Sequence, residues 1–114
     1  MKFEDFEEAN LDGANFEGAN LKGTDFKKAN LEEADLEGTD LVGANLEGAN
    51  LEGANLKKAN LKGADFEGAN LKGVNELTID QLSKVKTLYN TKLDDKLLIP
   101  LKEKYPALFE RPKL

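Results

Sequence analysis

Residues 44–63 read ANLEGANLEGANLKKANLKG, four copies of one five-residue unit. The same unit continues in both directions, so that Leu or Phe recurs at every fifth residue from Phe6 to Leu71, fourteen positions without a miss. Asn or Asp precedes each of these residues, and Ala or Thr stands one place earlier, except for Glu4 in the first unit. All ten glycines lie two residues after the large apolar residue.

A period of five matches neither the 3.6-residue period of an α-helix nor the two-residue period of a strand. The unit is typical of a short extended segment followed by a corner. We expect Leu or Phe and the small residue to point inward and the charged residues to stay outside. Gly, Asn and Asp suit the corners because they tolerate positive φ or bond to their own backbone.

Read as Ala-Asn/Asp-Leu/Phe-X-Gly, residues 4–75 resemble the pentapeptide-repeat family. The resemblance implies an all-β solenoid, a right-handed quadrilateral parallel β-helix with four units in each coil. Fourteen units then give about 3.5 coils, which stack to roughly 17 Å at ~4.8 Å per layer.

The repeat stops at Glu76, which occupies a Leu/Phe position and cannot enter a dry core without a partner. Thr78 and Gln81 have the spacing of a capping box, and apolar residues at helical intervals predict a helix from residue 79 to about residue 89. A second apolar stretch covers residues 93–109, with Asp94 as its N-cap. Pro100 interrupts it and Pro106 ends it, which predicts a kinked or two-piece helix.

These signals predict a β-helix over residues 1–76 and a helical cap over residues 77–114 that packs on the last coil, in one structural domain. Solenoid ends expose a core cross-section and unpaired edges unless something covers them. The C-terminal segment offers apolar residues for a lid or a dimer surface, namely Ile79, Leu82, Val85, Leu97, Leu98, Leu101, Leu108 and Phe109, and we include Ile99 in the lid. At the N-terminal end only Met1, Phe3 and Phe6 are available. Either Phe3 covers the opening, or two molecules meet there, or truncation or design created this end.

Composition argues against most chemistry. The chain has no Cys and no His, which excludes disulfides, thiolate–imidazole zinc sites and His general bases. We expect no catalytic residue, no cofactor and no metal. The column Asp5, Asp25, Asn45 and Asp65 is better explained by side-chain bonds to turns than by calcium, which prefers converging carboxylates. The sequence shows no secretory signal and no membrane span, so a cytoplasmic location is the default expectation.

The formal net charge of −6 argues against direct binding to nucleic acid or to an anionic membrane. Residues 1–75 carry a net charge of −8, and residues 76–114 a net charge of +2. Stacking every twentieth residue concentrates acid on two neighbouring faces, whereas another face mixes Glu with Lys27 and Lys28. The candidate interaction face consists of Asp12, Glu17, Glu32, Glu33, Glu37 and Glu52.

We therefore predict a non-enzymatic scaffold whose flat faces bind an unidentified protein partner, as a monomer or a weak end-to-end homodimer. The family resemblance adds an alternative, because some acidic members are rod-shaped dimers that resemble duplex DNA and bind bacterial DNA gyrase. A rod of roughly 17 Å spans only about five base pairs, which counts against this alternative.

Overall fold

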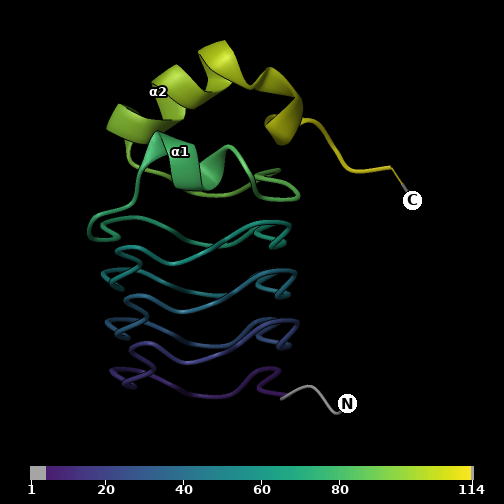
Figure 1. The fold of residues 1–114 in the computed structure, drawn as a ribbon. Coiled ribbons are helices and arrows are strands. Elements are labelled where there is room, and N and C mark those ends of the chain that lie inside the picture. Colours follow the sequence, from purple (N-terminus) through teal and green to yellow (C-terminus); the bar gives the residue numbers. More distant parts are fainter. Residues whose placement is uncertain (1–4, 114) are drawn as a thin grey trace.

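The chain winds into a stack of four-sided coils (Figure 1). The computed structural model describes residues 5–113, so that Met1 and Phe3, which were expected to shield the N-terminal end, lie outside the described residues. Each corner residue pairs in parallel with the residue twenty positions later, as Asp5 does with Asp25 and Asn10 with Asn30. The strands are reduced to these single pairs. The predicted coil of four units and its stacking are confirmed.

In a regular unit four of the five backbone amides donate within the unit or to the next coil. In the unit that begins at Asn10, the amides of Leu11 and Gly13 donate to carbonyls in the next coil over 2.7 and 2.8 Å. The amide of Ala14 closes a turn on the Leu11 carbonyl over 3.0 Å, and the amide of Asp12 donates to the Asn10 side chain over 3.2 Å. Because unpaired buried backbone groups are costly, this pattern explains why the unit requires Asn or Asp at its corner.

The last position of the unit requires a left-handed backbone. Gly13 has a φ of 71°, and the other nine glycines have φ between 67° and 72°. Four units place a charged residue in the same conformation, with φ between 58° and 61°, at Glu8, Lys28, Glu33 and Lys58. A left-handed conformation costs a non-glycine residue about 1–2 kcal/mol. These four units therefore carry strain that the glycine units avoid.

The inward positions form one continuous core. From Leu21 to Leu71 every Leu or Phe of the repeat is at most 5% exposed, and the Ala and Thr beside them are buried as well. In the first coil Phe6, Leu11 and Phe16 are only half-buried. Phe6 stacks on Phe26 with ring centroids 5.4 Å apart and meets Phe16 edge to face at 5.9 Å. Aromatic packing thus stabilises the first coil, where burial is less complete.

The chain leaves the coil at Glu76, which is exposed and has a φ of 59°. The predicted capping box is present, because the Thr78 side chain accepts from the Gln81 amide and the Gln81 side chain accepts from the Thr78 amide. The helix that follows, α1, covers only Ile79–Leu82. The prediction of a helix to residue 89 was wrong.

The ladder resumes after α1. Thr87 pairs with Asp65 and Lys92 with Asn70, both in parallel. The column that begins at Asp5 therefore has five layers instead of the four that the repeat predicts. The periodic apolar residues that suggested a longer helix belong partly to an additional piece of coil.

Residues 87–93 form a degenerate repeat unit. Leu88 and Leu93 are buried at inward positions, and Asn90, with a φ of 58°, takes the place of glycine. The Thr87 hydroxyl accepts from the amide of Tyr89 over 3.0 Å, as the Asn side chain does in a regular unit. Thr and Asn thus perform the tasks that Asn and Gly perform elsewhere.

Two more helical elements follow the additional coil. Helix α2 covers Asp95–Lys104, and a 3₁₀ helix, η1, covers Pro106–Phe109. Of the two expected forms, kinked or two-piece, the division at Pro100 is not observed, because α2 is continuous through that residue, and the helix does end just before Pro106. Asp94 is the N-cap by position, but its side chain accepts from the Gly73 amide over 3.0 Å. Figure 1 shows α1 and α2 at the end of the stack opposite the N-terminus.

The C-terminal apolar residues divide by burial. Leu82, Val85, Leu97 and Leu101 are at most 7% exposed and belong to the core. Partly buried against the same core are Ile79, Leu98, Leu108 and Phe109. Ile99, which was expected in the lid, is 61% exposed. The Leu108 carbonyl accepts from the Leu88 amide over 2.8 Å and thereby pairs part of the last coil.

Gln81 connects α1 to the coil beneath it. Its side-chain nitrogen donates to the carbonyls of Leu56 and Ala59 over 2.8 and 3.0 Å. These carbonyls lie where the next coil is interrupted. One amide group therefore pairs two carbonyls and completes the capping box.

Replacing Glu33 with Gly should stabilise the protein by about 0.5–1 kcal/mol, because relief of the left-handed strain exceeds the extra chain entropy of glycine. Glu32→Gly is the matched control, since it removes the same charge from the neighbouring position, where φ is not positive. The control should destabilise by about 0.5–1 kcal/mol. Urea unfolding measures both. A loss of stability in Glu33→Gly would contradict the strain argument.

Gln81→Glu keeps the side-chain length and the acceptor for Thr78 but removes both donors and brings a carboxylate near two carbonyl oxygens. We expect a loss of about 2 kcal/mol or more. Thr78→Ala, which removes only the other half of the capping box, should cost about 1 kcal/mol. Thermal unfolding compares the two variants. If Gln81→Glu cost no more than Thr78→Ala, the bonds to Leu56 and Ala59 would not matter.

Candidate functional site

The ladder divides the outer surface into four faces, each lying between two neighbouring corner columns. The first face follows the column of Asn10, the second that of Asn15, the third that of Asn20, and the fourth that of Asp5. Asp12, Glu32, Glu33 and Glu52 lie on the first face, and Glu17 and Glu37 lie on the second. The structure thus brings the six predicted acidic residues together on two adjacent faces. Four of them are exposed, and Glu32 and Glu37 are half-buried.

Some of these carboxylates are held by the coil above. The Asn55 amide donates to Glu37 over 3.2 Å, and the Asn70 amide donates to Glu52 over 3.3 Å. The Glu33 carboxylate lies across Gly53, where a Cβ atom would stand only 2.6 Å from it. Glycine in one layer therefore leaves room for a long side chain from the layer below. These contacts fix the negative charges in place.

The fourth face is also acidic, although none of its residues belongs to the predicted interaction face. It carries Glu7, Glu8, Glu47 and Glu67 beside Lys27 and Lys28. The corner column that borders it adds Asp5, Asp25 and Asp65, which gives seven carboxylates and two lysines. From the sequence this column is explained by side-chain bonds to the turns, and its aspartates are not assigned to a face. The twenty-residue spacing of the aspartates was the signal that places them on this face.

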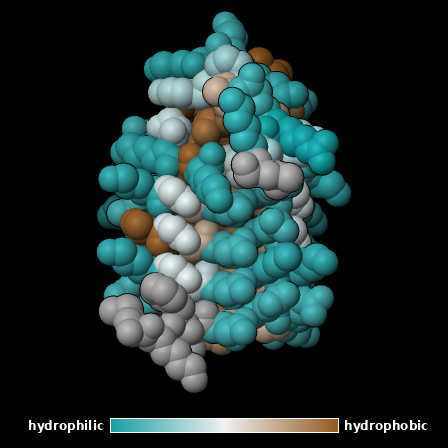
Figure 2. Space-filling model, turned by 90° about the vertical axis from the view of Figure 1, so that its right-hand side faces the viewer, coloured by the Kyte–Doolittle hydropathy of each residue, from teal (hydrophilic) through white to brown (hydrophobic). Residues whose placement is uncertain are grey.

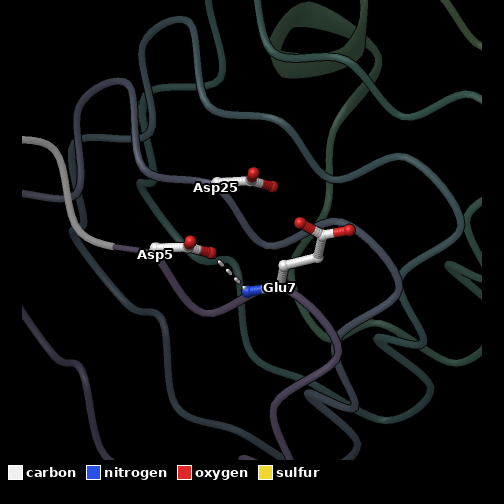
Figure 3. Close-up of side chains that lie close together, drawn as sticks. All are labelled: Asp5, Glu7 and Asp25. Carbon is white, nitrogen blue, oxygen red and sulfur yellow. Dashed lines mark hydrogen bonds between the residues drawn. The ribbon is translucent and has the colours of Figure 1, made fainter.

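The acid on the fourth face gathers in two clusters. Asp5, Glu7 and Asp25 have carboxylate oxygens within 4.8 Å of one another, and so do Glu47, Asp65 and Glu67. Figure 3 shows the first cluster, in which one Asp5 oxygen accepts from the amide of Glu7 over 3.0 Å.

Lys27 separates the clusters, since its ammonium lies 3.6 Å from a Glu47 oxygen. All six carboxylates in the clusters are exposed or half-exposed, so solvent screens their repulsion and they require no cation.

The third face has the opposite character. It carries Lys22, Val42 and Lys62, followed by Gly23, Gly43 and Gly63. Figure 2 shows one side of the column as mostly hydrophilic, with a narrow pale strip and little hydrophobic surface. The molecule is therefore electrostatically asymmetric around its axis.

The described residues show no arrangement for nucleophilic catalysis. The hydroxyl of Ser83, the one serine of the chain, donates to the Asp80 carbonyl over 2.7 Å and completes the end of α1. On α2, the exposed Ile99 lies beside Pro100, which lines an open pocket of about 440 Å³ with Glu103 and Lys104. None of the helices within residues 5–113 has the length and apolarity to cross a bilayer.

The repeat region matches the family model described as pentapeptide repeats, with eight copies over residues 5–38 and 39–75. Among solved structures, the chain is similar to trypsin-treated QnrB1, a plasmid-mediated fluoroquinolone resistance protein, with a TM-score of 0.63 and 26% identity. That match covers 81% of this chain and 44% of QnrB1, so the chain spans less than half of that protein.

A pentapeptide repeat protein from the thylakoid lumen of Arabidopsis thaliana gives a TM-score of 0.53 at 30% identity, over 88% of this chain and 72% of that protein. A comparison with curated proteins found no match. The relatives imply that the four-sided β-helix described above is right-handed.

Proposed function

The chain belongs to the pentapeptide-repeat family, and we propose that it is a non-enzymatic scaffold whose flat charged faces bind a protein partner. The observation that carries the proposal is the uneven distribution of charge around the column. Carboxylates outnumber lysines on the first and fourth faces, the second face carries two of each at its outer positions, and the only charged residues that the third carries there are Lys22 and Lys62. The core and the backbone ladder do not depend on these outer residues, which leaves them available for binding.

The partner surface that fits is cationic. Complementary charge steers encounter and selects the partner more than it adds raw affinity. The carboxylates of Glu37 and Glu52 are already held by asparagine amides, so binding would order fewer side chains. The six residues of the first two faces are our first candidate for the interface, and the fourth face is the second.

The C-terminal elements complete the scaffold as a cap. Support comes from Leu82, Leu97 and Leu101, which extend the core, and from the bond that ties the Asp94 side chain to Gly73. In this proposal residues 1–76 and 77–114 form one structural domain, which exists as a monomer or a weak end-to-end homodimer. The cytoplasmic location stays a prediction.

Charge reversal on single faces tests the proposal. Glu32→Lys with Glu52→Lys changes the first face, and Glu47→Lys with Glu67→Lys changes the fourth by the same charge. We expect a partner captured by the wild-type protein to be lost with one pair and retained with the other, because only one face touches it. Affinity capture with mass spectrometry measures this. A partner set that neither pair alters would contradict binding through these faces.

Mimicry of DNA toward bacterial gyrase is the second candidate. The structural likeness to a fluoroquinolone resistance protein and the acidic surface favour it. The longest dimension of the molecule is 35 Å, which corresponds to about ten base pairs at ~3.4 Å per step and is longer than the repeat alone predicts. The helices contribute part of that length, and the column itself remains short.

A supercoiling assay with purified gyrase separates the two candidates. A mimic should inhibit supercoiling or alter the response to a fluoroquinolone, and reversal of the acidic face that it uses should abolish the effect. Added salt should weaken the effect as well, since charges drive the contact. If tens of micromolar protein had no effect on supercoiling, DNA mimicry would be rejected and the protein-binding scaffold would be the remaining candidate.

A further inference from the structure

The interruption of the coil at Glu76 leaves a pocket of about 330 Å³ between the last turn of the second face and α1. Residues from both elements line it, namely Lys58, Ala59, Asn60, Leu61, Asp80, Gln81 and Lys84. In a complete coil a further unit would pair the backbone of residues 58–61. Here α1 stands in its place.

Two of the four backbone amides that the coil contributes to this pocket are unpaired. One coil below, the amides of Gly38 and Leu41 donate to carbonyls of the coil above over 2.8 and 2.9 Å. The equivalent amides of Lys58 and Leu61 form no hydrogen bond with any of residues 5–113. The carbonyls beside the gap are paired, because Gln81 donates to those of Ala59 and Leu56, and the Leu56 carbonyl also accepts from the Ala59 amide within its own turn. At this gap the two backbone amides are therefore unpaired, whereas the carbonyl oxygens already accept hydrogen bonds.

The side chains add further donors. Asn60 accepts from the Lys62 amide through its Oδ1 atom, and its Nδ2 group has no partner among the described residues. Lys84 pairs with Asp80 over 3.2 Å, which neutralises the one carboxylate in the lining. Lys58 has no carboxylate within 4 Å in the described part of the chain. Two ammonium groups and one amide therefore surround two free backbone amides.

Lys58 also occupies a strained position. Its φ is 61°, where ten other units use glycine. Backbone strain that persists at a position where glycine would relieve it is often connected with function. Glu8, Lys28 and Glu33 share the conformation, but none of them lines this pocket.

We propose that this pocket binds a small phosphate-type oxyanion. The amides of Lys58 and Leu61 and the Asn60 side chain donate to its oxygens, and the two lysines balance its charge. Successive backbone amides and cationic side chains are the usual components of anion sites. Phosphate binding at this pocket does not require the protein partner proposed for the acidic faces, so the two proposals can be tested separately.

Titration with inorganic phosphate, followed by amide NMR and compared with sodium chloride at equal ionic strength, tests the proposal. Saturable shifts of the Lys58 and Leu61 amides are expected with phosphate and not with chloride. Shifts that match those in chloride, or that spread without saturation over all lysine-bearing surfaces, would overturn it.

Lys58→Gly should weaken phosphate binding at least tenfold while it leaves the unfolding midpoint equal to or above that of the wild type. The matched control is Lys57→Gly, which removes the same charge outside the pocket lining and should change the affinity less than twofold. Asp80→Asn should tighten binding severalfold, because it removes the carboxylate from the wall. Equal weakening in Lys57→Gly and Lys58→Gly would show diffuse attraction and refute the site.

Discussion

Each coil of this solenoid takes its backbone hydrogen bonds from the next coil, and this requirement controls the rest of the structure. In a regular unit two amides donate to the next coil, one closes the turn, and one needs a side-chain acceptor, which Asn or Asp supplies. The turn that permits this pairing requires a positive φ once per unit. The core follows from the same geometry, because the pairing stacks Leu46 on Phe26 and under Phe66. Hydrophobic burial and backbone pairing therefore specify the same register.

The regular part of this arrangement could be predicted from the sequence because each task has its own residue type. The additional unit at residues 87–93 could not be recognised in the same way. Thr87 replaces Asn as the acceptor, and Asn90 replaces Gly in the left-handed position. Each replacement can do the work of the residue that it replaces. With both replacements, however, the unit no longer matches the Asn/Asp-Leu/Phe-X-Gly pattern in the sequence. Leu88 and Leu93 keep the five-residue spacing, but Val85 and Leu88 also fit a helix, and pattern alone does not decide between the two.

The surface was predicted less completely than the core, for a related reason. The turn residues are assigned a structural role from the sequence, so Asp5, Asp25 and Asp65 enter the net charge but not the charged faces. One oxygen of each carboxylate does accept from the turn, but the group is still exposed or half-exposed. The same residue therefore serves the fold and the surface. Gln81 is a second example, since its spacing predicts the capping box and not the two bonds to the coil beneath.

The outer residues differ in what they cost the fold. A charged residue at a middle position of the unit costs the backbone nothing. The left-handed position is different, because glycine adopts a positive φ there with less strain than any other residue. Ten units have glycine at this position. A lysine or glutamate at that position gives up stability to put charge on the surface. Lys58 does this beside a gap where backbone donors are also left unpaired, so two departures from the repeat coincide at one place. That coincidence is what separates an anion site from an ordinary solvated lysine.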